Sequence, residues 1–246
     1  MTRSLFLAGV VVMMAQNVAA VECETVEHLE TPFTVCEVDA SKEDLQLFLY
    51  DDAGDLLGQF FAIDQVLAKD DMKLSFAMNA GMYHEDRAPV GHFVQNGQEL
   101  MRVIENPGPG NFGMLPNGVF CLRAGRADVF ETSAYVRTAP GCNDATQSGP
   151  MLVIEGELHP RFLADGTSKY IRNGVGTSSD GRRVFFAISD APVNFHDFGV
   201  LFRDVLKTPN ALYFDGNISR LYAPDLNRND FGFRLGPIVG VVTEID

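Results

Sequence analysis

The segment Asn210-Ala211-Leu212-Tyr213-Phe214-Asp215-Gly216 joins an apolar run to an acidic residue and a glycine. Four apolar residues in a row, bounded by polar residues and glycine, are typical of a short buried strand. The preceding Pro209 cannot continue a helix, so it separates this strand from what comes before. The pattern therefore predicts a strand over residues 211–214 that carries the carboxylate of Asp215 to the edge of a sheet.

Three further stretches on the N-terminal side of this segment also favour strands. Residues 45–49 alternate with a period of two, and residues 73–78 and 183–188 are apolar enough to be buried strands. Between apolar runs lie dipeptides whose glycine can adopt a positive φ, so we expect several hairpins and much antiparallel pairing. These dipeptides are Asn96-Gly97, Ala124-Gly125, Glu155-Gly156 and Asp180-Gly181.

Two helices interrupt the predicted strands. Residues 61–68 form a short amphipathic stretch, and a second helix is expected after Asn194, whose side chain is suited to cap a helix N-terminus. We predict an α+β fold, with one strand-rich domain over residues 21–246, a twisted mixed or antiparallel sheet and a few packed helices. The apolar residues that define the second helix are Phe195, Phe198, Leu201, Phe202 and Val205.

Residues 1–20 have the pattern of a secretory signal peptide. Arg3 provides a positive start, residues 5–15 are almost entirely apolar, and Val18-Ala19-Ala20 offers small residues for cleavage. The apolar run is too short for a transmembrane span, and no stop-transfer flank follows it, which disfavours the alternative of a retained membrane anchor. We therefore expect export to a periplasm or to the outside of the cell, with no membrane span after cleavage.

Export gives the four cysteines a structural role, because disulfides form in oxidising compartments. Four cysteines allow three pairings. We favour Cys23 with Cys36 and Cys121 with Cys142, since each pair closes a short local loop and would stabilise the fold by about 3 kcal/mol. A zinc site is the alternative, but the cysteines form no C-x-x-C pair and have no histidine beside them at ligand spacing.

The net charge of the chain argues against some classes of binding partner. The chain of 246 residues has 19 Lys and Arg against 33 Asp and Glu, a net charge of −14. So acidic a protein is repelled by phosphate backbones, which makes nucleic acid and anionic membrane surfaces poor partners. A carbohydrate or sugar-phosphate substrate remains compatible, because one well-placed arginine can hold a phosphate even in an acidic protein.

Four polar segments punctuated by glycine lie at the ends of predicted strands or between apolar runs. Polar side chains beside glycines at such places can bring donors and backbone amides close to a ligand. Taken singly, each segment is also what an Asx or Ser turn looks like. The segments are Asn79-Ala80-Gly81-Met82-Tyr83, Gln147-Ser148-Gly149-Pro150, Arg172-Asn173-Gly174-Val175-Gly176 and Asp215-Gly216-Asn217-Ile218-Ser219.

In their order along the chain, these segments resemble the motifs of the phosphodiester glycosidase family, which contains the uncovering-enzyme-like domains. Pro89-Val90-Gly91 and Ser189-Asp190 add to the resemblance, which extends from about residue 45 to the C-terminus. One motif departs, because family members with assigned activity have two or three glycines between the aspartate and the serine. Here Asn217 and Ile218 stand in that place, and the chain looks more like a bacterial exported branch of the family.

The resemblance implies an exported hydrolase that cleaves a glycosidic phosphodiester, a sugar-1-phosphate link, in an envelope or extracellular glycan. Such a reaction needs a cation at the departing phosphate and a carboxylate that stabilises the sugar cation or activates water. Arg172 is the expected phosphate ligand, Asp215 the first candidate for the carboxylate and Asp190 the second. The expected substrate-binding residues are Asn79, Gly81, Tyr83, Gln147, Ser148, Gly149, Asn173, Gly216 and Asn217.

Other interpretations stay open at this point. A non-catalytic envelope protein that binds glycan with the same fold is favoured by the altered residues after Gly216. Asp190 before a proline is also typical of a turn, and Arg172 could pair with a structural carboxylate. An esterase using Ser148 is disfavoured, because the segment lacks the paired glycines of a nucleophile elbow. We expect no cofactor and no metal, since the five histidines have no metal-binding spacing and no dinucleotide fingerprint is present.

Overall fold

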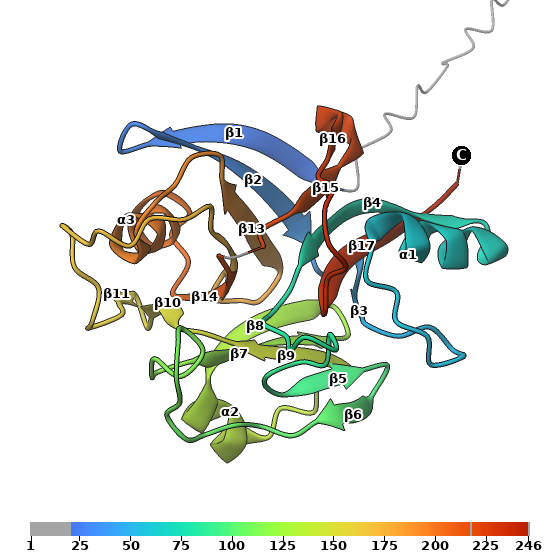
Figure 1. The fold of residues 1–246 in the computed structure, drawn as a ribbon, viewed down its shortest axis with the longest axis horizontal. Coiled ribbons are helices and arrows are strands. Elements are labelled where there is room, and N and C mark those ends of the chain that lie inside the picture. Colours follow the sequence, from blue (N-terminus) through green and yellow to red (C-terminus); the bar gives the residue numbers. More distant parts are fainter. Residues whose placement is uncertain (1–20, 217, 246) are drawn as a thin grey trace, which may run out of the picture.

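The computed structural model describes residues 21–216 and 218–245, and its strands form three sheets, here called A, B and C (Figure 1). The predicted signal peptide over residues 1–20 and the predicted substrate-binding residue Asn217 lie outside the described residues. Every strand pair in the described part of the chain is antiparallel. The predicted α+β class with a strand-rich domain is confirmed.

Sheet A has seven strands in the order β1-β2-β13-β12-β14-β10-β11. Two of its strands, β12 and β14, are central to the candidate site described below, and they pair with each other. The predicted strands over residues 183–188 and 211–214 are confirmed as β13 and β14. The strands of sheet A are β1 (Glu22–His28), β2 (Thr31–Asp39), β13 (Arg183–Ser189), β12 (Asn173–Thr177), β14 (Asn210–Asp215), β10 (Met151–Ile154) and β11 (Glu157–Leu158).

Sheets B and C have five strands each, in the orders β16-β15-β4-β17-β3 and β6-β5-β9-β7-β8. The four glycine dipeptides predicted as turns join neighbouring antiparallel strands, as expected. The strands of sheet B are β16 (Arg228–Asn229), β15 (Leu221–Ala223), β4 (Met72–Asn79), β17 (Ile238–Glu244) and β3 (Asp44–Phe48). The strands of sheet C are β6 (Gln98–Met101), β5 (Phe93–Gln95), β9 (Asp144–Ser148), β7 (Gly118–Arg123) and β8 (Arg126–Glu131).

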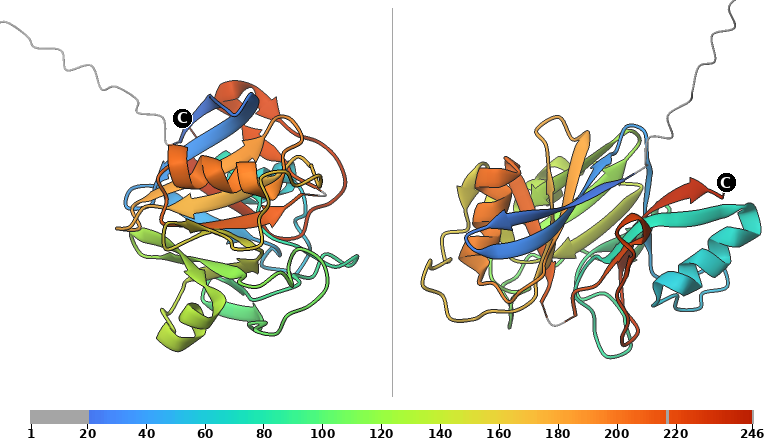
Figure 2. Two further views of the ribbon diagram at one scale, coloured as in Figure 1. Left: turned by 90° about the vertical axis from the view of Figure 1, so that its left-hand side faces the viewer. Right: turned by 90° about the horizontal axis from the view of Figure 1, so that it is seen from above.

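Three short α-helices pack against the sheets: α1 (Phe60–Leu67) on sheet B, α2 (Thr132–Thr138) on sheet C and α3 (Phe195–Val200) on sheet A (Figure 2). The chain continues from α3 as a π-helical turn over residues 201–205. Asn194 caps α3 as predicted, since its side chain accepts a hydrogen bond from the backbone N–H of Asp197 at 2.8 Å. Short 3-10 helices follow at Ala68–Asp70 and Pro224–Leu226. No helix among the described residues is long and apolar enough to cross a membrane.

Four phenylalanines, one or two from each sheet, hold the three sheets together. The ring centroid of Phe186 in sheet A lies 4.9 Å from that of Phe76 in sheet B and 5.9 Å from that of Phe120 in sheet C. Phe120 also contacts Phe214 of β14, with centroids 6.1 Å apart. All four rings are fully buried. Because aromatic rings bury large apolar areas, this cluster fixes how the ends of β4, β12 and β14 meet.

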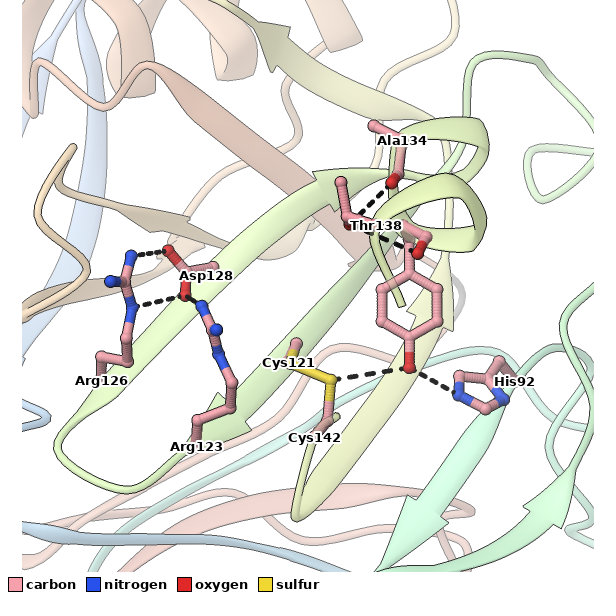
Figure 3. The surroundings of a disulfide bond; sticks show 9 residues. His92, Cys121, Arg123, Arg126, Asp128, Ala134, Thr138 and Cys142 are labelled. Atoms are coloured by element: carbon pink, nitrogen blue, oxygen red, sulfur yellow. Dashed lines mark hydrogen bonds and ion pairs between the residues drawn. A yellow bond between two sulfur atoms is a disulfide. The ribbon is translucent and has the colours of Figure 1, made fainter. Parts of the chain in front are cut away.

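Both predicted disulfides are confirmed. Cys23 bonds to Cys36 and fastens β1 to β2, while Cys121 of β7 bonds to Cys142 just before β9. The hydroxyl of Tyr135 lies 3.5 Å from the Cys142 sulfur and 2.9 Å from Nε2 of His92. This disulfide belongs to the hydrophobic cluster that Tyr135 of α2 also joins (Figure 3). Each bond closes a local loop, of the kind that lowers the entropy of the unfolded chain.

Candidate active site

Two asparagines join the ends of strands from different sheets. Asn79 ends β4 in sheet B, and Asn173 begins β12 in sheet A. The side-chain nitrogen of Asn173 donates to the backbone oxygen of Asn79 at 2.8 Å and lies 3.1 Å from its Oδ1. Both asparagines are fully buried, so these hydrogen bonds are needed to offset the cost of burying two amides. The contact holds the two strand ends in register.

Asp215 is held next to this pair by an irregularity in the sheet. The pairing of β12 with β14 shifts between Asn173 and Gly174, which leaves Phe214 as an extra residue on β14. Oδ1 of Asn173 accepts the backbone N–H of Asp215 at 3.1 Å. Ser148 donates its hydroxyl to the carbonyl of Phe214 at 2.8 Å, which satisfies the backbone on the other side. The carboxylate of Asp215 is half-buried and accepts the backbone N–H of Gly216 at 2.6 Å.

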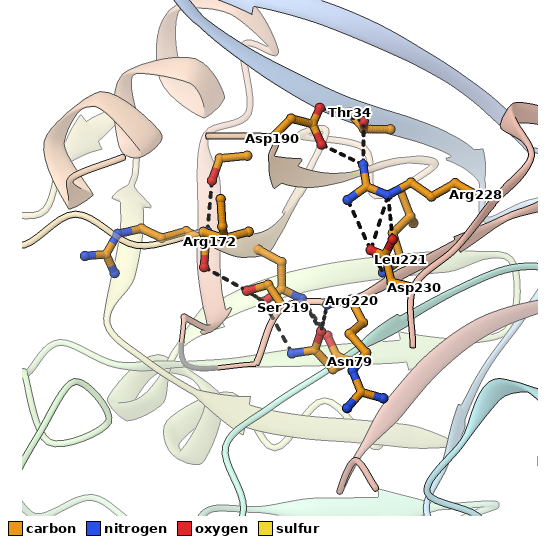
Figure 4. Close-up of polar contacts among 12 residues, drawn as sticks. Thr34, Asn79, Arg172, Asp190, Ser219, Arg220, Leu221, Arg228 and Asp230 are labelled. Carbon is orange, nitrogen blue, oxygen red and sulfur yellow. Dashed lines mark hydrogen bonds and ion pairs between the residues drawn. The ribbon is translucent and has the colours of Figure 1, made fainter. Parts of the chain in front are cut away.

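The chain after Asp215 folds back over the asparagine pair. Oδ1 of Asn79 accepts the backbone N–H of Arg220 at 2.8 Å. The hydroxyl of Ser219 lies 3.0 Å from the carbonyl oxygens of both Ile171 and Asp215 (Figure 4). The backbone is therefore fixed at Asp215 by Asn173 and at Arg220 by Asn79, both of which are buried. Such fixed polar loops at strand ends are where binding groups are commonly placed.

A cleft of about 710 Å³ opens beside this loop. Gly216, Ser219 and Arg220 line it on the side of the asparagine pair. Tyr170 forms another part of its wall, and Phe231 and Phe233 stand along the rim. The volume falls within the range of pockets that hold small molecules. The cleft therefore begins at the residue that follows Asp215.

Arg220 is the arginine that lines the cleft. Only 5% of the residue is exposed, and its Nη2 donates to the carbonyl of Phe233 while Nη1 lies 3.4 Å from Oε1 of Gln59. Burial lowers the pKa of Arg220, and the nearby Tyr83 and Asp230 act in the opposite direction. Arg220 was not among the residues predicted from the sequence, although it directly follows the segment from Asp215 to Ser219. Only the fold shows that it faces the cleft.

Arg172 is placed differently from Arg220, because it is fully buried. Its Nε donates to the carbonyl of Val193 at 2.8 Å and its Nη2 to the carbonyl of Ser168 at 2.9 Å. Phe195 covers the guanidinium, with the ring centroid 3.6 Å from Cζ. In Figure 4 the side chain extends away from Asn79 and Arg220. The direct phosphate contact expected from the sequence would require the guanidinium to become exposed.

Tyr213 and Gly216 connect Arg172 to the cleft. Nη1 of Arg172 lies 3.2 Å from the hydroxyl of Tyr213, whose pKa is raised by burial and by the charge of Asp215. A Cβ atom on Gly216 would stand 2.0 Å from that hydroxyl and 3.5 Å from Nη1. Position 216 therefore has to be glycine, because the backbone itself packs against the phenol and close to the guanidinium.

Tyr83 contributes a hydroxyl that has no hydrogen-bond partner among the described residues, although the oxygen is buried. Burial raises the pKa of Tyr83, the negative charge of Asp215 raises it further, and Arg87 and Arg220 lower it. The phenol is thus within electrostatic reach of Asp215 and Arg220. Buried polar atoms without partners are rare and expensive, so this hydroxyl is expected to pair with a water molecule or another bound group.

Gln147 and Gly149 of the second predicted segment, and Gly81 of the first, make contacts within the protein. Gln147 is buried, and its Oε1 accepts the backbone N–H groups of His92 and Ile104, each at 3.0 Å. Gly149 packs so closely that a Cβ atom would stand 2.6 Å from Cβ of Asn117. Gly81 likewise lies against the hydroxyl of Thr146. Each of these residues therefore contacts other parts of the protein. The sequence had predicted that they would contact a ligand directly.

Asp190 belongs to a separate ion-pair network. Its Oδ1 lies 2.6 Å from Nη1 of Arg228, and its Oδ2 accepts the hydroxyl of Thr34 at 2.8 Å. Arg228 also pairs with Asp230 at 3.1 Å (Figure 4). The structure therefore groups Asn79, Tyr83, Asn173, Asp215 and Gly216, and it adds Ser219 and Arg220. No three His, Cys, Asp or Glu side chains within residues 21–216 and 218–245 are arranged to hold a metal ion.

The sequence identifies the class to which this fold and site belong. The model of the phosphodiester glycosidase family matches residues 72–240, most of the chain, so the protein is a member of that family. Among individual proteins, it is 37% identical over 150 residues to the uncharacterized protein YigE of Escherichia coli K12. That match covers 61% of this chain and 58% of YigE, so the chain spans little more than half of the relative it matches.

Two solved structures share the fold. The zebrafish N-acetylglucosamine-1-phosphodiester alpha-N-acetylglucosaminidase catalytic domain, auto-inhibited by its pro-peptide, superposes with a TM-score of 0.63 over 92% of this chain and 85% of that one. A hypothetical protein from Synechocystis gives a TM-score of 0.56 over 90% of this chain and 61% of the other. Each is 12% identical to this chain, so both comparisons concern the fold alone.

Proposed function

We propose that this protein is an exported hydrolase of glycosidic phosphodiesters in an envelope or extracellular glycan. The observation that carries the proposal is the position of Asp215. Asn173 holds its backbone, and the next residue, Gly216, lines a cleft that Arg220 also borders. A carboxylate one residue before a cleft that an arginine also lines suits a substrate with a sugar and a phosphate.

In the proposed reaction, water attacks the anomeric carbon of the sugar. The bond between that carbon and the phosphate oxygen breaks, and the oxygen leaves with the phosphate as a monoester. A phosphate monoester is weakly basic, so the leaving oxygen needs charge neutralisation more than a proton. Asp215 is then required on the sugar side, where it stabilises the cationic sugar or accepts the proton of water.

We assign different roles to the two arginines near the proposed phosphate position. Arg220 lines the cleft and is the arginine we place nearest the phosphate, where its charge neutralises the leaving group while Phe233 and Gln59 hold the guanidinium. Arg172 lies behind the wall formed by Tyr170, whose ring centroid is 5.5 Å from its Cζ. We assign Arg172 to positioning, because it holds Tyr213 and so the backbone of Gly216. Asp190 takes no part in this arrangement, because it pairs with Arg228 in a separate network.

Tyr83 completes the proposed site as a donor to the substrate. Its hydroxyl is buried and lacks a partner among the described residues, while its raised pKa keeps the proton on the phenol at neutral pH. A neutral phenol donates a hydrogen bond to a sugar hydroxyl or to a phosphate oxygen.

The test measures hydrolysis of a panel of sugar-1-phosphodiesters, including UDP-N-acetylglucosamine and methyl diesters of glucose and N-acetylglucosamine 1-phosphate. We expect Asp215→Asn to abolish turnover of the reactive member. Asp190→Asn is the matched control, because its carboxylate stands in the Arg228 network. Circular dichroism and thermal unfolding show whether each variant is folded. A folded D215N enzyme with full activity would overturn the assignment.

Ile218 favours a second candidate, a glycan-binding protein without catalysis. It lines the cleft and packs against the apolar cluster beneath α1, in the segment where the motif of family members with assigned activity has glycines. A bulkier residue at this point narrows what can approach the backbone. Binding of the sugar phosphates by calorimetry, with no turnover of any diester, would select this candidate over the hydrolase.

Export is part of the proposal and rests on the N-terminal pattern together with the two disulfides. Expression of the full chain in a Gram-negative host, followed by fractionation and N-terminal sequencing, tests it. We expect the protein outside the cytoplasm with Val21 as its first residue. Recovery of the uncleaved chain in the cytoplasm would contradict it.

A further inference from the structure

Aromatic rings connect Arg172 to a buried histidine outside the candidate site. The ring centroid of Phe195 lies 3.6 Å from Cζ of Arg172. Phe162 stacks on Phe195, with centroids 5.1 Å apart and ring planes inclined by 10°. His159 stacks in turn on Phe162, with centroids 4.8 Å apart and ring planes inclined by 26°. These three rings, here called the ring column, end at the guanidinium that holds Tyr213.

The guanidinium at one end of the ring column depends on neutral groups. Arg172 is fully buried, and among the described residues its guanidinium donates to two backbone carbonyls and to the hydroxyl of Tyr213. A buried charge without a carboxylate partner is sensitive to the position of each dipole and aromatic face around it. Phe195 covers the guanidinium and also contacts the ring of Tyr213 edge to face, with centroids 4.8 Å apart. A displacement of Phe195 would therefore change both residues that fix the backbone of Gly216.

His159, at the other end of the ring column, fits the structure as a neutral imidazole. Only 1% of the residue is exposed. Nδ1 accepts the backbone N–H of Arg161 at 3.2 Å, so the proton of the neutral ring lies on Nε2, which has no hydrogen-bond partner among the described residues. Burial lowers the pKa of His159; the nearby carbonyl of Leu115 opposes the shift, and the charge of Arg161 adds to it. The position therefore disfavours an imidazolium.

Protonation of His159 would disturb this arrangement in two ways. A proton on Nδ1 would face the backbone N–H of Arg161, and two donors that face each other cannot form a hydrogen bond. The imidazolium would also share the ring column with the Arg172 guanidinium, so that two buried cations would lie at its ends. To be stable as a cation, the histidine has to move toward solvent.

The elements around His159 supply no counter-ion. Strand β10 accepts its backbone N–H, and residues 114–116 lie beside its ring, but neither stretch has a titratable side chain. The titratable side chains of α3 are His196 and Asp197, which pair with each other at 3.0 Å. Glu157 of β11 is exposed, and no described residue forms an ion pair with His159. A proton on the buried ring therefore remains uncompensated.

The chain that follows His159 forms part of the candidate site. Residues 160–171 lead from the histidine to Arg172, and within them the carbonyl of Ser168 accepts Nη2 of Arg172 at 2.9 Å. Tyr170, near the end of this segment, lines the cleft, and its ring centroid lies 5.5 Å from Cζ of Arg172. A movement of His159 toward solvent would therefore reach the site both through the ring column and along the chain.

We propose that His159 is a positioning residue for the candidate site and makes that site sensitive to pH. The neutral imidazole supports the Arg172 guanidinium through Phe162 and Phe195, and protonation removes that support. The consequence for activity rests on the proposed function, whereas the consequence for Arg172 does not. Because the buried position favours the neutral form, the change is expected below about pH 6.5, where exposed histidines titrate.

Nuclear magnetic resonance of the Arg172 Nε–H group tests the proposal without a substrate. This group donates to the carbonyl of Val193 at 2.8 Å, and the Phe195 ring covers the guanidinium, so its signal reports on the position of that ring. Contacts with the ring protons of Phe195 assign the signal. In the parent protein we expect the signal of pH 7.5 to shift or be lost at pH 5.0, where circular dichroism checks the fold. His159→Phe keeps a ring in the column but cannot be protonated, so its signal should be the same at both pH values.

Two further variants guard this measurement. His196→Gln is the matched control, because His196 is the neighbour of Phe195 in the chain but pairs with Asp197, and its Arg172 signal should respond to pH as in the parent protein. Phe162→Leu leaves His159 in place and interrupts the ring column, so the response should shrink, and this variant decides the matter where His159→Phe does not fold. An Arg172 signal that does not respond in the parent protein, or that responds equally in His159→Phe or Phe162→Leu, would overturn the proposal.

The pH profile of kcat on the reactive diester separates this role from the proposed function. Between pH 7.5 and pH 5.0 we expect kcat of the parent protein to fall about tenfold more than kcat of His159→Phe. An equal fall in both proteins would show that His159 does not position the site, even though the protein is a hydrolase. If the Arg172 signal depends on His159 while no diester is hydrolysed, the hydrolase is wrong and the positioning of Arg172 stands.

Discussion

Oδ1 of Asn173 accepts a hydrogen bond from the backbone N–H of Asp215 at 3.1 Å, at the point where β12 and β14 fall out of register. The same side chain donates to the backbone of Asn79 at 2.8 Å. One buried amide therefore fixes the candidate catalytic residue and joins two sheets. Substitution of Asn173 should consequently reduce both the stability and the activity of the protein.

The first prediction concerns Asn173→Ala. The change leaves a buried N–H of Asp215 and a buried carbonyl of Asn79 without their partner, so we expect a loss of about 3 kcal/mol in the free energy of unfolding. Urea unfolding followed by circular dichroism measures it. Asn229→Ala, at an exposed position on β16, is the control and should change the free energy by less than about 0.5 kcal/mol. Similar losses in both variants would contradict the role of the amide.

The second prediction concerns Gly216→Ala. A Cβ atom would stand 2.0 Å from the hydroxyl of Tyr213, so the backbone after Asp215 must move. We expect kcat/KM on the reactive diester to fall by about a hundredfold, because small displacements of catalytic groups are costly. The double variant Gly216→Ala/Tyr213→Phe lacks the clashing hydroxyl and should recover part of that loss relative to G216A. No recovery would show that another contact makes glycine necessary.

The third prediction separates the two arginines. Arg172→Lys removes a guanidinium that donates to Val193, Ser168 and Tyr213, and a lysine cannot reach all three. We expect a loss of about 3 kcal/mol in the free energy of unfolding. Arg220→Lys is instead expected to raise KM for the diester by about tenfold, because a lysine cannot make the contacts that hold the guanidinium beside the cleft. A raised KM in R172K without loss of stability would make Arg172 the direct phosphate ligand.

The fourth prediction concerns acid stability and His92. Burial lowers the pKa of His92, although the carbonyl of Met101 and Glu99 oppose the shift. The folded protein therefore takes up the proton at a lower pH than the unfolded chain, whose histidines titrate near pH 6.5. The contribution of His92 to stability is complete above about pH 6.5 and is lost as the pH falls below it, by up to about 1.4 kcal/mol per pH unit.

Unfolding in urea at pH 5, 6, 7 and 8 measures this dependence. We expect His92→Gln to flatten the slope below pH 6.5, since the titrating group is gone. His84→Gln is the control, because His84 is exposed. An unchanged slope in H92Q would assign the acid sensitivity elsewhere, for example to the buried His159, whose pKa is also lowered by burial.

Local patterns predicted much of the fold. The glycine dipeptides, the capping residue Asn194 and the short cysteine loops depend on neighbours within a few positions, and the structure confirms all of them. The strand over residues 211–214 was predicted for the same reason. The predicted apolar face of the second helix was less accurate at its C-terminal end, because Val205 is 41% exposed.

The roles of single polar residues were harder to predict. Gln147 and Arg172 read as ligand-binding residues in the sequence, yet both are buried and bound by the protein's own backbone. Arg220 carried no distinguishing signal, although it borders the cleft. A side chain's surroundings depend on distant residues; Asn79 and Arg220, for example, are separated by 141 positions.

The sequence by itself determined the strand-rich class and the position of Asp215 at a strand end, and it favoured the disulfide pairs that the structure shows, since strands, turns and local loops follow from residues close together in the chain. Only the tertiary structure decided that Arg220 faces the cleft while Arg172 lies behind Tyr170. That decision is made where three sheets meet around Phe76, Phe120, Phe186 and Phe214. Packing between distant segments, which no local pattern encodes, sets the side of each strand end that is open to solvent.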